Sequence, residues 1–185
     1  MTPISNFILA LWIVFWFYWL ISALAAKRNI RRAPVGPRIF IILAVILLLQ
    51  FPQARAFFFA NRNFMLNPWI AGLGALLCVA GIALAVWARL YLGKNWGMPM
   101  SLKENPELVT TGPYRFVRHP IYSGILLAML GSALASGLLW LLVFILFGSY
   151  FVYAAHTEEQ IMQRQFPGQY PAYQKRTNAL IPFIW

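Results

Sequence analysis

The sequence predicts an all-α integral membrane protein with about five transmembrane helices, a C-terminal helical hairpin and a short cytoplasmic tail. Of its 185 residues, 61% are hydrophobic and only 10% are charged, a balance typical of membrane proteins. Long uncharged runs recur along the chain, and no linker, repeat or low-complexity segment divides it into domains. We therefore expect residues 1–185 to form one membrane domain, with three helices in residues 1–91 and a loop, the hairpin and the tail in residues 92–185.

The first predicted helix lies in residues 7–26, a run of 20 residues without charge. About 20 apolar residues are needed to cross the hydrocarbon core of a bilayer. No basic segment precedes this run, and it is longer than the ~7 to 15 apolar residues of a signal peptide. We expect it to be a retained transmembrane helix.

The second and third predicted helices follow in residues 38–91. The second begins near Arg38 and weakens at Pro52, because proline removes a backbone hydrogen bond. The third begins at Pro68, a residue suited to the first turn of a helix, and runs to about Tyr91. This third helix lies in an uncharged stretch of 26 residues, 63–88.

A compact helical hairpin is predicted in residues 121–155, which are uncharged for 35 residues. This run is too long for one crossing and too short for two crossings of ~20 residues each plus a turn. The turn is expected in residues 131–137, between half-hairpins at 121–134 and 138–155. The first half is short, so we expect it to tilt or to thin the bilayer locally, which draws the polar segment before it towards the membrane.

The basic residues predict the orientation in the membrane. They cluster in the loop after the first helix, in the segment before the hairpin and in the tail. The first group is Lys27, Arg28, Arg31, Arg32 and Arg38, the second is Arg89, Lys94, Lys103, Arg115 and Arg118, and the third is Arg164, Lys175 and Arg176. Basic loops face the cytoplasm, which leaves only Arg55 and Arg62 outside. The prediction is five spans in a bacterial inner membrane, with the N-terminus outside and the C-terminus inside.

The net charge of +11 has the same explanation, because basic residues near a membrane are attracted to the anionic cytoplasmic leaflet. No segment of the chain resembles a nucleic-acid-binding module. The expected partners are therefore the membrane and a lipid or lipophilic small molecule, and the oligomeric state is not predicted.

The acidic residues are few and unevenly placed. There are only four, and Glu104 and Glu107 lie in a polar loop where we expect them to be solvated. Glu158 and Glu159 are adjacent and follow the last apolar run almost directly. Neighbouring carboxylates at a membrane boundary repel each other unless a cation or hydrogen-bond donors compensate them. The pair either marks the exit of a helix or forms a site for a positively charged ligand.

A dense polar and aromatic segment, GPYRFVRHPIYSG at residues 112–124, stands directly before the hairpin. By itself it fits either a headgroup collar or a catalytic mouth. Together with further residues it resembles the isoprenylcysteine carboxyl methyltransferase family and its phospholipid methyltransferase relatives. The further residues are Asn95, Trp96, 108–111, Glu158, Glu159, Phe166, Tyr170, Tyr173, Arg176, Ile181 and Pro182. The resemblance covers the C-terminal half of the chain from Arg89 onward.

The resemblance implies an S-adenosylmethionine-dependent methyltransferase. Its cofactor pocket would lie at the cytoplasmic side, and its lipophilic acceptor would arrive from the bilayer. The implied cofactor-binding residues are Ser101, Pro106, Glu107, Leu108, Val109, Tyr114, His119, Pro120, Ile121, Tyr122 and Glu158. The implied catalytic residues are Arg118 and Glu159.

These assignments agree with the chemistry of the cofactor, which carries an ammonium, a carboxylate and a sulfonium. Glu158 can pair with the ammonium, while His119 or an arginine can bind the carboxylate. Tyr114 and Tyr122 offer ring faces, and a cation–π contact contributes roughly 0.5 to 2 kcal/mol. Pro120 suits the first turn of a helix, whose free amides favour an anion. Methyl transfer needs alignment and exclusion of water, but no metal and no covalent nucleophile.

Simpler interpretations exist for several of these residues. Arg115 and Arg118 fit headgroup anchors, since basic residues beside a membrane span are common. Tyr170 and Tyr173 are expected to form part of an interfacial aromatic belt. His156 is expected to be a hydrogen-bonded structural residue, and two histidines without cysteine or clustered acids do not make a metal site.

Two departures from the family pattern leave the methyl acceptor open. The prenylcysteine enzymes place an arginine one helical turn before the functional glutamate, where this chain has Ala154. Its absence weakens the case for a carboxylate acceptor. The tail reads FPGQY at residues 166–170, so we expect the preceding helix to stop near Gln165. The acceptor could be a prenylcysteine-like carboxylate, a prenylated thiol, a lipid amine or another amphiphile.

Two other classes of protein compete with this interpretation. A membrane reductase of the sterol reductase type would bind NADPH and would need a basic site for its phosphates, which the Glu158–Glu159 pair argues against. A non-catalytic membrane scaffold would leave that pair unexplained.

Overall fold

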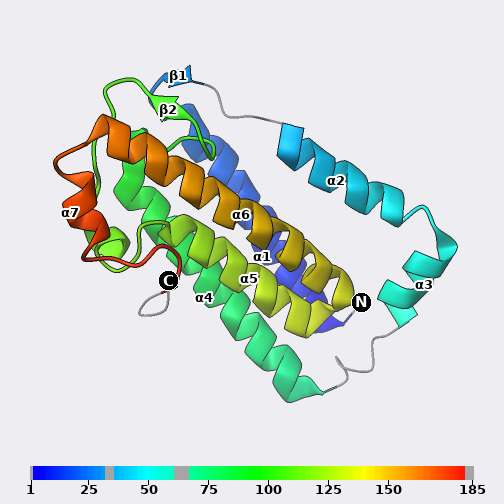
Figure 1. Ribbon diagram of the computed structural model, residues 1–185. Helices are drawn as coiled ribbons and strands as arrows, with labels where there is room; N and C mark the ends of the chain where they lie inside the picture. Colours follow the sequence, from blue (N-terminus) through cyan, green and yellow to red (C-terminus); the bar gives the residue numbers. More distant parts are fainter. Residues whose placement is uncertain (1, 32–35, 61–66, 182–185) are drawn as a thin grey trace.

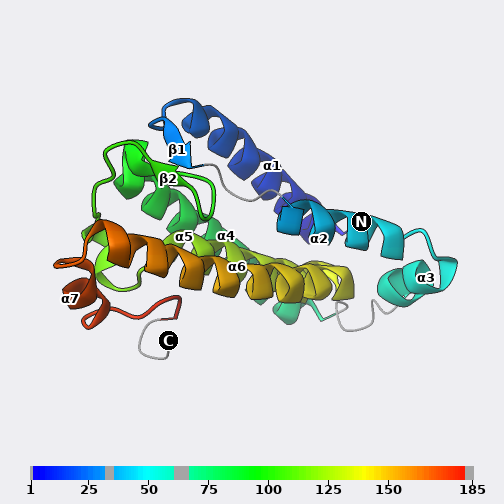
Figure 2. The ribbon, with the colours of Figure 1, turned by 45° about the horizontal axis from the view of Figure 1, so that its top comes forward.

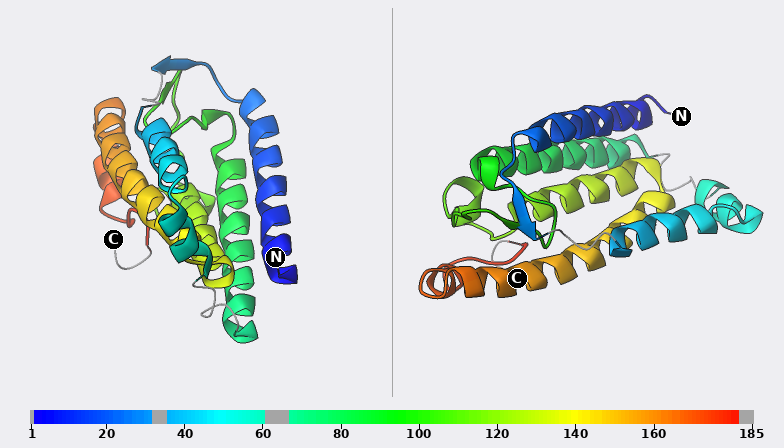
Figure 3. Two further views of the ribbon diagram at one scale, coloured as in Figure 1. Left: turned by 90° about the vertical axis from the view of Figure 1, so that its right-hand side faces the viewer. Right: turned by 90° about the horizontal axis from the view of Figure 1, so that it is seen from above.

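The computed structural model describes residues 2–31, 36–60 and 67–181 as a bundle of long helices (Figure 1). The bundle is formed by α1 (Pro3–Leu24), α4 (Pro68–Leu92), α5 (Pro120–Ser136) and α6 (Leu138–Gln165). Seen from above, these helices follow one another in this order across the molecule (Figure 3). Arg32, Arg62 and Pro182, which the sequence singled out, lie outside the described residues. The predicted all-α class is confirmed, apart from two very short strands.

Local capping signals set the starts of the helices. The side chain of Thr2 accepts a hydrogen bond from the Ser5 amide at the start of α1. Asn67 does the same for Trp69 at the start of α4, and the following residue, Pro68, occupies the first turn as predicted. Such side-chain oxygens satisfy amides that have no partner within the helix.

Helices α4 and α5 approach each other closely because small residues face one another along their interface. A Cβ atom added at Gly81 would lie 2.4 Å from the Ala128 amide nitrogen, and one added at Gly131 would lie 2.4 Å from the Gly74 carbonyl oxygen. Gly124 is equally close to the backbone of α4. Small residues are the usual means of bringing helix backbones together in a membrane.

Helix α1 is joined to this pair by a buried polar contact. The indole nitrogen of Trp12 donates to the Ser132 hydroxyl at 3.0 Å, and Ser132 donates in turn to the Ala128 carbonyl. The Trp12 ring also stacks on Trp140 of α6, with ring centroids 5.6 Å apart. The outward face of α1 remains apolar: Ile13 and Phe17 are 61% and 67% exposed. A helix that exposes such residues is suited to lipid contact.

By length and composition, three helices of the described chain can cross a membrane: α1, Pro68–Asn95 and α6. A fourth crossing arises if α2 (Gly36–Leu48) and α3 (Pro52–Ala60), which meet at 89°, act as one broken span. Helix α5 is apolar but has only 17 residues. All five predicted segments are therefore helical, while the count of five crossings stays a prediction.

The hairpin differs in detail from the prediction. Its turn is the single residue Gly137, whose φ of 122° favours glycine, rather than residues 131–137. Helix α6 then continues past the predicted end at Ala155 and stops at Gln165, where the break before Pro167 was expected. Hydrophobicity marks where the apolar part of a helix ends, whereas the helix itself extends into polar residues.

The remaining segments gather at one end of the bundle. Strand β1 (Asn29–Arg31), which follows α1, pairs with β2 (Leu102–Lys103) of the long loop after α4 (Figure 2). The short 3₁₀-helices η2 (Gly93–Asn95) and η3 (Gly112–Arg115) and helix α7 (Tyr170–Gln174) lie at the same end. The basic segments after α1, before α5 and in the tail thus come together, and the cytoplasmic location of this end stays a prediction.

Candidate functional site

A cavity of about 410 Å³ opens where these segments meet. Its walls come from the end of α1, the loop between α4 and α5, the first turns of α5, the middle of α6 and helix α7. This volume falls in the range of roughly 300 to 1,000 Å³ that is usual for small-molecule sites.

Glu158 forms the polar end of this cavity. One of its carboxylate oxygens, Oε1, accepts hydrogen bonds from the Tyr122 hydroxyl at 2.6 Å and from the Met100 amide at 2.7 Å. The other, Oε2, lies 3.4 Å from Nδ1 of His119. The carboxylate is thus held by α5 and by the loop before it, although it belongs to α6.

Glu159 points to a different set of partners. Its Oε1 accepts from Nε of Arg118 at 2.6 Å and lies 3.5 Å from Nε2 of His119. Its Oε2 accepts from the Gln174 side chain at 2.7 Å. Successive residues of a helix point about 100° apart, so the two carboxylates diverge and flank His119. The compensation that adjacent carboxylates require is therefore present.

His119 is nearly buried and precedes the first residue of α5. Burial disfavours its charged form, but the two carboxylates outweigh burial and raise the pKa of the His119 imidazole. The ring stacks in parallel on Tyr122, with centroids 5.4 Å apart, and Tyr122 stacks on Phe151 at 4.6 Å. This stack gives the polar end of the cavity a rigid aromatic side.

Tyr170 and Tyr173 belong to the wall of the cavity, so the prediction of an interfacial belt is wrong for both. They are only 2% and 4% exposed, because α7 folds back onto α6 and onto the segment before α5. Tyr173 donates a hydrogen bond to the Tyr114 carbonyl. Burial raises the pKa of Tyr173 to about 12 and raises that of Tyr114 and Tyr170 further. All three are neutral hydroxyls.

Most of the predicted site residues line this cavity. They are Ser101, Pro106, Glu107, Leu108, Val109, Tyr114, Arg118, His119, Ile121, Tyr122 and Glu158. Pro120 does not, because it is fully buried as the first residue of α5. Glu159 does not either: it borders a separate cavity of about 100 Å³ beside Arg118 and His156. The hydroxyl of Ser101 is buried and has no hydrogen-bond partner within the described chain.

Glu107 is solvated as expected, since 71% of its side chain is exposed, but it also joins two segments. It pairs with Lys27, which follows α1, at 3.0 Å and accepts from Asn95 at 3.1 Å. The hydrogen bond from Lys27 lowers the pKa of the Glu107 carboxyl. This pair and the β1–β2 ribbon hold the loop over one side of the cavity.

Arg89, which the sequence grouped with the basic residues of the segment before the hairpin, lies inside the protein. It is 4% exposed and donates to the carbonyls of Ser22, on α1, and Gly93. Its guanidinium lies over the Trp96 ring, 4.7 Å from the centroid. Arg89 thereby connects α1 to α4 and supports Trp96 in the cavity wall.

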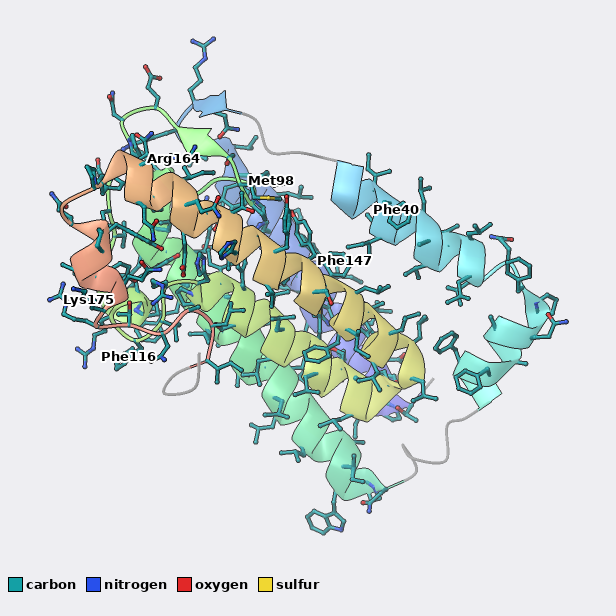
Figure 4. The ribbon with its side chains drawn as sticks, viewed as in Figure 1. Phe40, Met98, Phe116, Phe147, Arg164 and Lys175 are labelled. Atoms are coloured by element: carbon teal, nitrogen blue, oxygen red, sulfur yellow. The ribbon has the colours of Figure 1, made fainter. Side chains whose placement is uncertain are left out.

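The apolar end of the cavity was missed from the sequence. Trp16, Trp19 and Leu20 of α1 line it, together with Met98 and Phe147 (Figure 4). Trp16 and Leu20 are 50% and 67% exposed, so the cavity is open along the exposed, apolar side of α1. The spacing of the two tryptophans places them on one helix face, but nothing local distinguishes that face from the rest of an apolar helix.

Comparison with known proteins gives consistent matches. The family model described as phospholipid methyltransferase matches residues 69–169. A cobalt-zinc-cadmium resistance protein of Cupriavidus metallidurans is 31% identical over 116 residues, covering 62% of this chain and 51% of that protein. Protein-S-isoprenylcysteine O-methyltransferase B of Arabidopsis thaliana is 27% identical over 120 residues, covering 63% and 61%. The corresponding enzyme of Schizosaccharomyces pombe is 30% identical over 126 residues, covering 66% and 53%. The chain thus spans about half to three fifths of these relatives.

Proposed function

The chain belongs to the phospholipid methyltransferase family, and we propose that it transfers a methyl group from S-adenosylmethionine to a lipophilic acceptor that enters from the bilayer. One observation carries this proposal. A single cavity joins a polar end at Glu158 to an apolar end at Trp16 and Leu20, which are exposed on the apolar side of α1. A water-soluble donor and a membrane-soluble acceptor would meet in such a cavity.

The residues of the polar end fit S-adenosylmethionine. Glu158 presents a carboxylate that is held in place by Tyr122 and Met100 and would hold the ammonium of the cofactor. The Ser101 hydroxyl, buried without a partner among the described residues, offers a hydrogen bond to a polar group of a ligand. Tyr122 already stacks on His119 and Phe151. The Tyr114 ring, which borders the same space, would therefore provide the π face that favours a cation.

When bound, S-adenosylmethionine supplies an electrophilic methyl group on a positively charged sulfur. The task of the protein is to align the acceptor with that methyl group and to exclude water. Trp96, which is 8% exposed, forms part of the cavity wall, and the buried Met100 donates its amide to Glu158. Trp16, Trp19 and Phe147 would hold the apolar part of the acceptor.

The proposal includes the side of the membrane on which the cofactor binds and the class of the methyl acceptor. We place the cofactor site at the cytoplasmic face of a bacterial inner membrane, where the basic segments gather. Several curated relatives are named for protein-S-isoprenylcysteine O-methylation, which makes a prenylcysteine-like compound one candidate acceptor. Ala154 has no charge to offer a carboxylate acceptor. It is also fully buried and lies outside the cavity wall. A thiol or amine amphiphile is therefore equally compatible with the site.

Calorimetry with the purified protein tests the proposal. We expect S-adenosylmethionine and S-adenosylhomocysteine to bind and NADPH not to bind. Glu158→Gln keeps an oxygen that accepts from Tyr122 and Met100 but removes the charge, and we expect affinity to fall roughly 10- to 100-fold, the usual effect of losing a charged hydrogen bond. Glu104→Gln, which changes an exposed acidic residue, is the matched control. Binding of NADPH alone would refute the proposal in favour of a reductase, and no binding of either cofactor would favour a scaffold.

A further inference from the structure

The segment after α6, residues 166–181, folds back and pairs with the backbone before α5; we call this segment the tail. The Arg118 amide donates to the Asn178 carbonyl at 2.8 Å, and the His119 amide donates to the Ala179 carbonyl at 3.0 Å. The Ser123 hydroxyl donates to the Leu180 carbonyl. The tail is therefore a direct neighbour of His119.

The Arg118 side chain adds a second set of links to the tail. Its Nε pairs with Glu159 at 2.6 Å, and its Nη1 donates to the carbonyls of Gln174 and Thr177. Gln174 donates in turn to the second oxygen of Glu159 at 2.7 Å. The two charged side chains are 10% and 14% exposed. Together they join the start of α5, the end of α6 and the tail at one point.

The contacts of Arg118 and Glu159 point away from the large cavity, which argues against a direct role of these two residues in methyl transfer. Both oxygens of Glu159 are occupied by donors of the protein, and its carboxylate lies outside the large cavity. Arg118 does border that cavity, but its Nε and Nη1 are directed to Glu159 and to tail carbonyls. We propose that Arg118 and Glu159 are positioning residues: a clamp that docks the tail and so completes the wall of the cofactor site.

The docked tail supplies part of the cavity wall. Tyr170 and Tyr173 of α7 form part of the cavity wall, and Tyr173 is bonded to the Tyr114 carbonyl. Release of the tail would also remove the partner of the His119 amide. A ligand in the cavity and the docked tail should therefore favour each other, because coupling between two equilibria is reciprocal. This second half of the inference rests on the proposed function.

Limited trypsin digestion measures docking directly. Lys175 (Figure 4) and Arg176 are exposed and directly follow Gln174. Cleavage after Arg176 requires the chain there to leave its docked conformation. Removing one member of a buried ion pair leaves the other uncompensated, so we expect Arg118→Met to speed release of the peptide that begins at Thr177 by about tenfold or more. Arg118→Lys should restore part of the protection. An unchanged rate would overturn the clamp.

The matched control is Arg115→Met, the same chemical change three residues earlier. Arg115 is exposed, and its guanidinium lies over the Phe116 ring at 4.5 Å. We expect the release rate to stay at the wild-type value in this variant. Equal acceleration in both variants would show that loss of any arginine here loosens the tail, and would contradict the proposal.

Gln174→Ala keeps the test decisive if Arg118→Met is too unstable, and a double variant tests whether the two charged residues act as one unit. Gln174→Ala removes the hydrogen bond to Glu159 and an exposed one from Gln163 but leaves the Arg118–Glu159 pair, and we expect it to speed release by a smaller factor, about threefold. In the double variant Arg118→Met with Glu159→Leu, the effect should be no larger than that of Arg118→Met alone, since residues that act as one unit are not additive. Multiplication of the two single effects would show that the residues act independently.

The final experiment adds S-adenosylhomocysteine at saturation. We expect it to slow release of the peptide from the wild-type protein and to bind Arg118→Met about tenfold more weakly. If Arg118→Met loses affinity while its tail stays protected, Arg118 acts on the ligand by contact and the clamp is refuted. If the wild-type protein binds no S-adenosyl compound, the proposed function fails, whereas the order of release rates among the variants still decides the clamp.

Discussion

At the scale of single residues, His119 is the point at which both carboxylates of the site meet. Glu158 and Glu159 lie within 3.4 and 3.5 Å of its two ring nitrogens, Arg118 precedes it, and Tyr122 covers its face. The neighbouring charges raise the pKa of His119 in spite of burial. Protonation of His119 is therefore favoured, and it would place a positive charge between two carboxylates that otherwise repel each other.

This arrangement predicts a pH dependence of stability. The pKa of His119 is higher in the folded than in the unfolded protein. Its protonation therefore contributes fully to the free energy of unfolding below the unfolded pKa of about 6.5. This contribution is lost as the pH rises through the raised pKa of the folded protein. We expect Tm in detergent micelles to fall over that interval in the wild-type protein and to lose this part of its pH dependence in His119→Gln.

The matched control for this prediction is His156→Gln, which changes the other histidine of the chain. His156 is exposed and bonded only to Gln160 among the described residues. Its replacement should leave the pH dependence of Tm as it is in the wild type. If His119→Gln keeps the full dependence, another group is responsible for it.

At the scale of elements, the contact between α4 and α5 decides how the site is built. Gly74, Gly81, Gly124 and Gly131 allow the two backbones to touch, and this contact positions the start of α5, which carries His119 and Tyr122. Hydrophobicity predicted both helices, but it did not identify which of their faces meet. A glycine in an apolar run is equally compatible with a lipid-facing position.

Gly81→Ala tests the importance of this contact. The added Cβ would lie 2.4 Å from the Ala128 amide nitrogen and 2.5 Å from the Gly124 carbonyl oxygen, which are backbone atoms that cannot turn aside. We expect a loss of about 1 to 3 kcal/mol in the free energy of unfolding, as for other overpacked sites, measured by thermal unfolding in micelles.

Gly72→Ala is the internal reference for that measurement. Gly72 lies in the same helix, is exposed, and a Cβ there would meet nothing within 4 Å. Alanine is favoured over glycine in a helix by roughly 0.5 to 1 kcal/mol, so this variant should be neutral or slightly stabilised. Similar losses in both variants would mean that close approach of α4 and α5 is not the cause.

At the scale of the whole molecule, the directions of the helices bear on the number of crossings. The ends of α1 and α4 lie side by side, since Arg89 donates to Ser22 and the Lys27 amide donates to the Lys94 carbonyl. Both helices therefore run towards the site (Figure 1). The chain between them must return along the length of the bundle, and it contains α2 and α3. This arrangement favours five crossings, with the two termini on opposite sides of the membrane.

Labelling with a membrane-impermeant maleimide tests this topology. The native Cys78 is fully buried, so single cysteines introduced at the exposed residues Asn6 and Gly168 can be followed against a low background. In intact spheroplasts of a bacterial host, we expect the cysteine of Asn6→Cys to react with the maleimide. The cysteine of Gly168→Cys should react only after the spheroplasts are lysed. Reaction of both residues from the same side would require an even number of crossings.

The amino-acid pattern was enough to predict the membrane class, the positions of the long helices and the residues at the polar end of the cavity. These features depend on local properties: apolar runs, prolines at helix starts, and a motif whose residues are close together in the chain. Even the end of α6 at Gln165 was marked by the proline that follows.

Which side chains meet became clear from the folded arrangement of the helices. It placed His119 between the two carboxylates, turned Tyr170 and Tyr173 inward, separated Glu159 from the cavity and opened the cavity along the exposed, apolar side of α1. Each of these results depends on contacts between segments that are far apart in the sequence. The energy of such contacts comes from packing and hydrogen bonds that no single segment contains, so local patterns could not predict them.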